Sequence, residues 1–407
     1  MNENLKKKNV GIEILAPAGN YEMLHTAINS GCDSIYFGIA GFNLRANAKN
    51  FSIDEISKVI KICHQKSIKA YACLNIVIFE DELDFLKKVL DVLSKCKVDG
   101  VICWDFAVIS IALKKGLNVH LSTQASVLNS ISIKEYEKLG VSRIILAREC
   151  SLTDIKKIQE KTNLELEIFI HGAMCVAVSG RCFISQYLYG KSANRGECIQ
   201  PCRRSYDLID PETSKELNIT ENYVMSPKDL CTIDIIDKLL ELDVKCFKIE
   251  GRNRSPEYLK KTIECYKKAI EFYKKGILTE NVKLKLKEEL SMVYNRGFST
   301  GFFLSKPINE WTDSYGNKSN YVKKYVGRIL NYYKKINVAE VKLETENLNL
   351  NDKLIITGNK TGCVDFTLKS IQFNKKEINC GLKGQNVAIK VPFVVRKNDK
   401  VFIFTKK

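Results

Sequence analysis

From Ile12 onward, short runs of apolar residues alternate with segments in which apolar residues recur every three or four positions. The first pattern is typical of strands buried on both faces, and the second of helices that cover a sheet. Helical segments separate nearly all of the strand segments, so the pattern predicts parallel strands joined by helices. Eight strand segments can be recognised, at residues 12–18, 34–39, 69–78, 100–105, 119–126, 143–149, 166–172 and 246–252.

Eight β/α units over roughly 250 residues match the size of a TIM-like (β/α)8 barrel. The alternative α/β fold is an open, doubly wound sheet. That fold usually carries a G-x-G-x-x-G or P-loop turn after a strand, and this sequence has neither. We therefore expect the barrel, with residues 229–243 forming the helix that precedes the eighth strand.

The pattern changes near residue 308. Residues 308–321 are polar and lack apolar periodicity, and the segments after them read as short strands with Gly and Asn turns and no helix. This predicts a small closed all-β barrel at the C-terminal end. The expected organisation is a TIM-like domain over residues 1–307, a linker over 308–324 and a small β-domain over 325–407.

The chain is basic, with 64 Lys and Arg against 47 Asp and Glu and a formal net charge of +17. Such an excess favours a polyanionic partner such as RNA, although lysines spread over solvated surfaces would give the same number. The longest apolar run is too short to cross a membrane, and the first residues lack the apolar stretch of a secretory signal. We expect a cytoplasmic protein with no membrane segment.

Polar residues follow the predicted barrel strands at their C-terminal ends, where TIM-like barrels place their chemistry. Each has a structural alternative: Asp105 and Ser126 could cap helices or shape turns, and the Arg–Glu neighbours could be ion pairs at the barrel rim. The convergence of several favours an active site. The candidates are Asn75, Asp105, Gln124, Ser126, Arg148, Glu149, His171, Glu250 and Arg252.

Four of the 15 cysteines follow the seventh predicted strand in the pattern C-x6-C-x15-C-x3-C, at Cys175, Cys182, Cys198 and Cys202. They begin an irregular excursion that continues through residues 183–228. Structural zinc sites usually have two short C-x2-4-C pairs, whereas loose spacing with glycines and arginines suits an iron–sulfur cluster. Spacing alone favours the cluster only modestly, and Cys231 is a spare candidate ligand.

Hydrolase machinery is harder to find. The chain has four histidines, and only His171 is near these cysteines. There is no G-x-S-x-G or H-E-x-x-H motif. A Cys182–His171 pair stays open as a peptidase alternative.

The segment EIFIHGAMCVAVSGRCFIS at 167–185 resembles the signature of the peptidase U32 family. LAPAGN (15–20), DSIYFG (33–38), STQAS (122–126), NRGECIQPCRRSY (194–206), SPKDL (226–230) and the KIEGR–SPEY region (248–258) are also similar to that family. The resemblance covers about residues 12–300, and the C-terminal segment is similar to the small β-barrel of many members.

Some members of that family are described as collagenase-like proteases, and others take part in oxygen-independent hydroxylation of tRNA, 23S rRNA or ubiquinone. For the RNA branch the resemblance implies a 4Fe–4S cluster on Cys175, Cys182, Cys198 and Cys202, with prephenate as a co-substrate. We therefore expect hydroxylation of a pyrimidine in tRNA or rRNA. A cysteine peptidase and a non-catalytic Fe–S or RNA-binding accessory protein are the alternatives.

Overall fold

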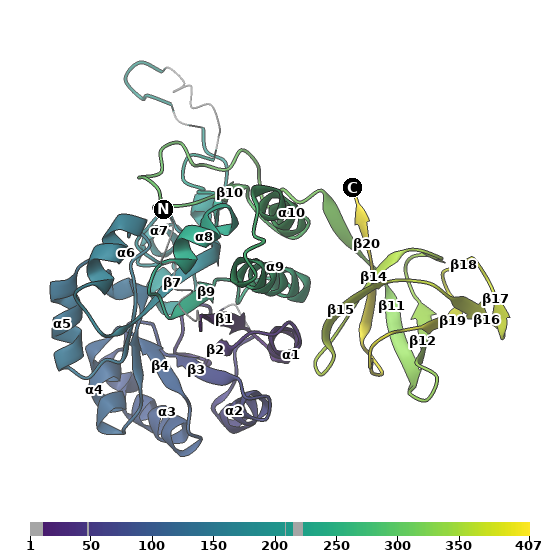
Figure 1. Cartoon of the computed structure of the whole chain (residues 1–407), viewed down its shortest axis with the longest axis horizontal. Coiled ribbons are helices and arrows are strands. Elements are labelled where there is room, and N and C mark those ends of the chain that lie inside the picture. Colours follow the sequence, from purple (N-terminus) through teal and green to yellow (C-terminus); the bar gives the residue numbers. More distant parts are fainter. Residues whose placement is uncertain (1–10, 47–48, 208, 215–222) are drawn as a thin grey trace.

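The computed structural model describes residues 11–46, 49–207, 209–214 and 223–407 (Figure 1). The N-terminal stretch that we compared with secretory signals lies largely outside these residues. Parallel strands form the centre of the first domain, and their order around the sheet follows the chain. They are β1 (Glu13–Ala18), β2 (Ser34–Gly38), β3 (Lys69–Cys73), β4 (Gly100–Cys103), β5 (Val119–Leu121), β6 (Arg143–Ile145), β7 (Glu165–Gly172) and β9 (Cys246–Ile249).

The strands close into a barrel. β1 pairs in parallel with both β2 and β9, and β9 pairs in parallel with β7, so the eight parallel strands form a closed ring. An open doubly wound sheet would instead leave two edge strands unpaired. The predicted TIM-like (β/α)8 barrel is therefore confirmed.

Helices surround this ring (Figure 1). Their apolar faces follow the helical period, as in α3, where Leu86, Val89, Leu90 and Leu93 are all buried. The helices are α1 (Tyr21–Asn29), α2 (Ile56–His64), α3 (Leu83–Lys95), α4 (Phe106–Lys114), α5 (Ser130–Lys138), α6 (Leu152–Gln159), α8 (Ile236–Leu240), α9 (Pro256–Lys274) and α10 (Glu280–Ser291), with α7 (Ile184–Tyr189) in the excursion.

Two candidate residues have structural roles at element ends. Asp105 is the N-cap of α4, and its carboxylate accepts a hydrogen bond from the backbone N–H of Ala107 at 2.8 Å. Ser126 has a φ of 54° and ends the short helical turn Thr123–Ala125. The cap and turn interpretations of these two residues are the ones that the structure supports.

The expected helix at 229–243 begins later than predicted. Its first residues form the strand β8 (Asp229–Cys231), which pairs antiparallel with the end of β7 and parallel with β10 (Phe298–Ser299). Helix α8 covers only Ile236–Leu240. Backbone hydrogen bonds offered by the extended end of β7 decide the conformation here, and the local apolar pattern could not reveal them.

The interior of the barrel holds buried charges that are paired with one another. Arg143 is 1% exposed and bonds to Glu13 at 3.1 Å and to Glu167 at 3.3 Å. Glu167, which is fully buried, also pairs with Lys248 at 2.8 Å. Charges removed from water are tolerated only when they are compensated in this way.

The C-terminal domain is an antiparallel sheet in the order β15-β14-β20-β11-β12-β19-β16-β17. It begins at Tyr321, inside the expected linker. Within residues 321–407, all of which are described, the end strands β15 and β17 do not pair with each other, so the predicted closure is not seen. The strands are β11 (Tyr321–Tyr333), β12 (Val338–Leu343), β14 (Lys353–Gly358), β15 (Gly362–Thr367), β16 (Ile371–Phe373), β17 (Lys376–Glu377), β19 (Asn386–Lys390) and β20 (Lys400–Lys406), and β13 (Leu348–Asn349) pairs with β18 (Cys380–Gly381).

This domain packs on the barrel through β15, which lies beside α1 and α9 (Figure 1). Gly362 has a φ of +70°, and a Cβ there would lie 2.7 Å from the backbone N of Thr26, so only glycine permits this approach. Lys260 and Asp365 form an ion pair across the contact at 2.6 Å. The two domains thus share a close interface with its own charge pairing.

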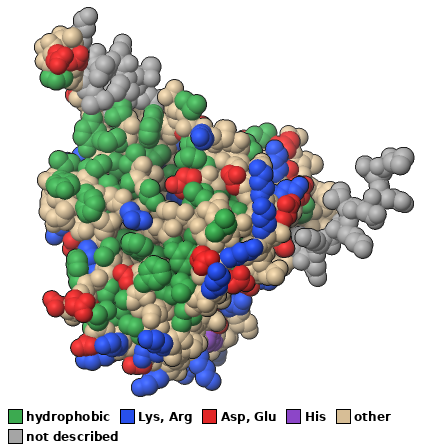
Figure 2. Space-filling view, turned by 90° about the vertical axis from the view of Figure 1, so that its left-hand side faces the viewer, with side chains coloured by type: hydrophobic (Ala, Val, Ile, Leu, Met, Phe, Trp, Pro, Cys, Tyr) green, Lys and Arg blue, Asp and Glu red, His purple; other side chains and the backbone are tan. Residues whose placement is uncertain are grey.

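The barrel face at the left of Figure 1, over α4 and α5, gathers apolar side chains (Figure 2). Phe106 and Ile131 are the most exposed of these, at 63% and 74%. In the described residues, no helix combines the length and the apolarity needed to cross a bilayer.

Candidate functional site

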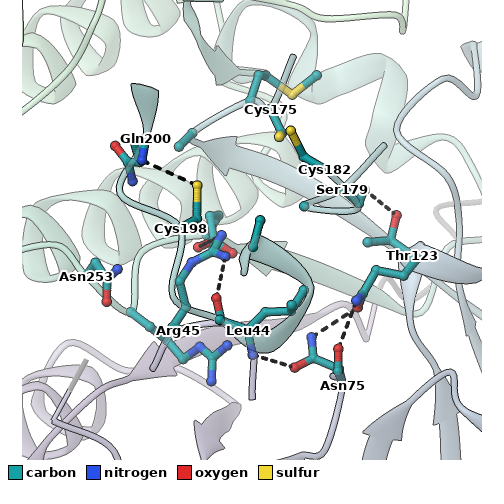
Figure 3. Close-up of a pocket in the computed structure, with 18 of the residues that line it drawn as sticks. Leu44, Arg45, Asn75, Thr123, Cys175, Ser179, Cys182, Cys198, Gln200 and Asn253 are labelled. Carbon is teal, nitrogen blue, oxygen red and sulfur yellow. Dashed lines mark hydrogen bonds and ion pairs between the residues drawn. The ribbon is translucent and has the colours of Figure 1, made fainter. Parts of the chain in front are cut away.

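A cavity of about 150 Å³ lies at the end of the barrel where the parallel strands finish (Figure 3). This is the end at which TIM-like barrels bind their ligands. The excursion that follows β7 folds over the cavity and contributes much of its wall. The barrel contributes side chains from six of its strands, namely Tyr36, Cys73, Ile102, Ile145, Phe169 and Lys248.

The four candidate ligands Cys175, Cys182, Cys198 and Cys202 all line this cavity. Every cysteine of the chain is a free thiol, and most outside this group are buried. Figure 3 shows the side chains of Cys175 and Cys182 directed toward one another, with Cys198 across the same space. The spacing in the sequence therefore identified thiols that the fold brings to one place.

The thiols are close enough to influence one another electrostatically. Burial raises the pKa of Cys202, Arg203 opposes this, and the charges of Cys175, Cys198 and Cys182 raise it further. Burial likewise raises the pKa of Cys198. Ionising all four thiols to thiolates would therefore require compensating positive charge, such as a metal centre provides.

Backbone N–H groups already point at two of the sulfurs. The N–H of Ile184 lies 3.5 Å from Cys182 Sγ, and the N–H of Gln200 lies 3.4 Å from Cys198 Sγ. Gln200 itself has a φ of 59°, an uncommon conformation for a residue with a side chain. Hydrogen bonds of this kind stabilise and tune thiolate-bound clusters.

The excursion is fixed to the barrel loops beside the cavity. Gly196 has a φ of +85°, and a Cβ there would lie 2.4 Å from the carbonyl O of Asn43. Its carbonyl accepts a hydrogen bond from the N–H of Ala46 at 3.0 Å. Arg195 binds both carboxylate oxygens of Glu82. These contacts place the thiols against the loop that follows β2, so their position is set by tertiary structure.

A carboxylate surrounded by arginines lies at the cavity wall. Glu250 pairs with Arg45 at 3.0 Å and also faces Arg148 and Arg252. Burial alone would raise the pKa of Glu250, but the charges of Arg45, Arg148 and Arg252 outweigh it and lower the pKa to about 2. Glu250 is therefore ionised at neutral pH, and it is shared among several cations.

The cavity nevertheless has more positive than negative charge. In the described part of the chain, Arg148, Arg203 and Arg252 have no carboxylate within ion-pair distance, and the buried Nε atoms of Arg148 and Arg252 have no hydrogen-bond partner. Arg148 instead donates to the carbonyl of Ala173 at 2.7 Å. Burial lowers the pKa of Arg148, as expected for an undercompensated cation. Such a site favours an anion.

Two amides on the wall orient one another. Asn75 Nδ2 donates to Gln124 Oε1 at 3.2 Å, and Gln124 Nε2 donates to the carbonyl of Asn75 at 2.8 Å. The Asn75 side-chain oxygen also accepts from the N–H of Leu44 at 3.3 Å (Figure 3). Each amide nitrogen carries a second hydrogen that a bound molecule could use.

Five of the candidate residues lie outside the cavity lining, namely Asp105 and Ser126, whose cap and turn roles are given above, and Glu149, His171 and Cys231. Glu149 is exposed, one residue beyond Arg148, so the expectation that it lines the pocket is wrong. His171 is 2% exposed, with its Nδ1 facing Tyr266 Oη at 3.4 Å, and burial, with a smaller contribution from Arg254, lowers its pKa to about 3. Cys231 is buried 3.9 Å from the same hydroxyl, away from the other thiols.

The sequence did not point to Arg45, Tyr36 or Lys248, which also line the cavity. Arg45 lies in the Gly- and Asn-rich loop after β2, and loops at this end of a barrel are where such a residue could have been sought. Tyr36 and Lys248 face the barrel interior. Their polar atoms lie within buried strands, where the alternation of inward and outward positions was the available signal.

Close in the chain to residues that line the cavity, aromatic rings and arginines lie together. Arg181 lies over the ring of Trp104 at 5.0 Å, and Arg204 lies over Tyr189 at 5.4 Å. Tyr187, on α7, is 87% exposed, and Phe183 beside it is 61% exposed. Among the described residues, neither Arg181 nor Arg204 has an ion-pair partner. The segment that carries the thiols therefore also presents flat rings and positive charge.

Several known proteins are similar in sequence to this chain, two of them over nearly their whole length. A protein of Methanocaldococcus jannaschii named as an uncharacterized protease is 41% identical, covering 97% of this chain and 98% of that protein. A protein of Porphyromonas gingivalis named collagenase is 38% identical, with the same coverage of both chains. The tRNA hydroxylation protein P1 of Bacillus subtilis is 36% identical, covering 79% of this chain and 77% of that protein.

The family model for peptidase family U32 matches residues 19–313, which is most of the chain and includes all four thiols of the cavity. The resemblance drawn from the signature segment is thereby confirmed. The chain belongs to peptidase family U32.

Proposed function

We propose that this protein is an iron–sulfur enzyme that hydroxylates a pyrimidine of tRNA or rRNA without molecular oxygen, with prephenate as a co-substrate. The observation that carries the proposal is the position of four thiols of one segment around a single cavity at the ligand-binding end of the barrel. The name of the relative from Bacillus subtilis refers to tRNA hydroxylation, which supports an RNA substrate.

The residues of the cavity suit a 4Fe–4S cluster on Cys175, Cys182, Cys198 and Cys202. In the described residues, no three Cys, His, Asp or Glu side chains converge as they would around one metal ion. A four-iron cluster takes one thiolate per iron and so needs the ligands further apart than a zinc ion does. The N–H groups directed at two sulfurs and the uncompensated arginines fit its negative charge.

A cluster bound there would supply electron transfer. Conversion of a pyrimidine C–H bond to C–OH is a two-electron oxidation, and it balances when a donor molecule gives up an oxygen atom and is itself reduced by two electrons. In the proposal, the paired amides of Asn75 and Gln124 orient the base through their remaining hydrogen-bonding capacity. Arg148 and Arg252, whose Nε atoms lack partners, bind the carboxylates of the co-substrate.

The target base must leave its stack to reach such a cavity. Unpaired nucleotides of loops are the ones a pocket can accept at low cost, and flipped bases are commonly held against aromatic rings. The exposed rings of Tyr187 and Phe183, and Arg204 stacked on Tyr189, lie in the same segment as the thiols and suit that role. The substrate is therefore an unpaired pyrimidine.

A cysteine peptidase is the second candidate, favoured by the collagenase name of one relative. Its chemistry needs a base beside the thiol. In the part of the chain that the structure describes, no histidine lines the cavity, and His171 is buried against Tyr266 with its pKa lowered to about 3. The geometry thus gives a cysteine nucleophile no imidazole partner.

Anaerobic purification tests the proposal. We expect a brown protein with about four irons and four sulfides per chain. Cys198→Ser should lose most of the iron, whereas Cys96→Ser, a half-buried thiol outside the cavity, should retain it. A colourless protein that cleaves denatured collagen, with cleavage lost in Cys182→Ala, would overturn the hydroxylase proposal in favour of the peptidase. A protein that binds the cluster while cellular RNA is unchanged by deletion of its gene would be an accessory protein.

A further inference from the structure

The positive charge of this chain is concentrated in its smaller domain. Residues 321–407 contain 18 Lys and Arg against seven Asp and Glu, a net charge of +11. The remaining 320 residues contain 46 Lys and Arg against 40 Asp and Glu and contribute only +6. A net positive charge of this size attracts polyanions. The C-terminal domain, rather than the barrel, therefore carries most of the charge that suggests an RNA partner.

The strand register aligns three of these cations across the sheet. Arg328 of β11 lies directly opposite Lys342 of β12 on one side and Lys400 of β20 on the other. All three are exposed. Figure 1 shows β12, β11 and β20 as neighbours in this domain. Directly paired residues of an antiparallel sheet project from the same face, so the three cations form one row, which we call the basic row.

Among the described residues, the basic row is neutralised only in part. Arg328 pairs with Glu344 at 3.1 Å. In the described part of the chain, neither Lys342 nor Lys400 has a carboxylate within ion-pair distance. Like charges directly opposite each other destabilise a sheet. An arrangement that costs stability in the free protein is relieved when an anion binds along it.

The same face of the sheet continues with an aromatic ring and another lysine. Val338 of β12 lies opposite Tyr333 of β11 and Lys390 of β19, and Tyr333 is 47% exposed. Between the two rows, Glu340 is the one acidic residue among the paired positions. A sheet face with cations and an exposed aromatic ring is a form that single-stranded RNA-binding modules use.

The register places Lys323 and Asp365 on the same sheet face as the basic row, nearer the barrel, and these charges are paired. Asp365 pairs with Lys260 at 2.6 Å, and Lys323 pairs with Glu257 at 2.8 Å. The cations that dock the domain thus have partners within the protein, whereas the two lysines of the basic row do not. This contrast separates the basic row from lysines that merely balance the fold.

We propose that the basic row binds the phosphate backbone of the RNA substrate, so that the C-terminal domain holds the RNA while the cavity acts on one base. This proposal rests on the proposed function and assigns the domain its part in it. Phosphate contacts of this kind position a nucleic acid without reading its sequence. The domain therefore adds affinity and leaves the choice of base to the cavity.

The test uses the full-length protein and bulk tRNA from a strain that lacks the gene. Binding of fluorescein-labelled tRNA is followed by anisotropy between 50 and 200 mM KCl, a range in which each lost phosphate contact lowers the slope of log K against log salt by about 0.7 to 0.9. Lys342→Gln/Lys400→Gln removes two such contacts and should therefore reduce the steepness of the slope by about 1.4 to 1.8. The control, Lys375→Gln/Lys376→Gln, removes the same charge at the β16–β17 turn, away from the row.

An unchanged slope in Lys342→Gln/Lys400→Gln would overturn the proposal, as would an equal decrease in the control. Polyglutamate that displaces tRNA as well as unlabelled tRNA does would also overturn it, in favour of an acidic protein partner. Failure of this proposal can be distinguished from failure of the proposed function. If the variant binds tRNA as wild type does, and its iron content and RNA modification are normal, only the role of the basic row is rejected. If the wild-type protein contains no iron, the proposed function is rejected.

Discussion

Glu250→Gln tests the electrostatics of the cavity most sharply. Glu250 is ionised, largely buried and shared by Arg45, Arg148 and Arg252. A fall of its pKa from 4.5 to about 2 corresponds to about 3 kcal/mol of favourable interaction with its surroundings. Removing one partner of a buried ion pair in other proteins costs about 3 to 5 kcal/mol. Because glutamine keeps the shape but not the charge, we expect a loss of about 3 kcal/mol at pH 7.

The sign of the pH dependence follows from the same shift. The folded-state pKa of Glu250 is depressed, so its contribution is fully present above pH 4.5 and is lost as the pH falls toward 2. Urea unfolding of the barrel between pH 7 and pH 3 should therefore show a difference between wild type and Glu250→Gln that shrinks on acidification.

Glu149→Gln is the matched control, because Glu149 is an exposed carboxylate on the same rim. It should change stability by no more than about 0.5 kcal/mol. A Glu250→Gln variant that unfolds within about 1 kcal/mol of wild type at pH 7 would refute the reasoning, since the three arginines would then not depend on this carboxylate.

Three further predictions concern individual residues. Cys202→Ser should lose iron and Cys231→Ser should keep it, because of these two thiols only Cys202 lines the cavity. Iron and sulfide analysis measures this, and the reverse result would make Cys231 the ligand in place of Cys202. Arg143→Met should lower the unfolding free energy by about 3 kcal/mol or more, because it leaves Glu13 and Glu167 buried without their shared cation; a neutral change in urea denaturation would contradict this. His171 stays neutral in the folded protein down to about pH 3 while the unfolded chain takes up a proton near pH 6.5, so it lowers stability as the pH falls between these values. His171→Phe should flatten that part of the stability profile, and an unchanged profile would show that His171 titrates normally.

The sequence was most informative where a local pattern and the fold agree. Each of the eight barrel strands coincides with a segment picked out by its apolar run, β7 beginning one residue earlier than predicted, because buried parallel strands need continuous apolar sequence. The pattern failed at Asp229–Cys231, where pairing with the end of β7 makes a strand of residues that continue a helical sequence. It correctly predicted an all-β C-terminal domain, but not the open edges of that sheet, which depend on which strands meet.

The candidate site was also predicted in part. Cys175, Cys182, Cys198 and Cys202 stood out by spacing, and residues at strand ends such as Gln124 and Glu250 did line the cavity. Arg45 could not be identified, because it reaches Glu250 from a loop about 200 positions earlier in the chain. Glu149 was predicted but is exposed, because one step along a loop separates it from the lining residue Arg148.

The central claim is that this protein hydroxylates RNA with a cluster held by the four cavity thiols. Mass spectrometry of nucleosides from tRNA and rRNA tests it most directly, in a strain lacking the gene and complemented with wild type, Cys198→Ser or Cys96→Ser. We predict that one hydroxylated pyrimidine disappears on deletion and returns with wild type and Cys96→Ser but not with Cys198→Ser. An unchanged set of pyrimidine nucleosides in the deletion strain would contradict the claim.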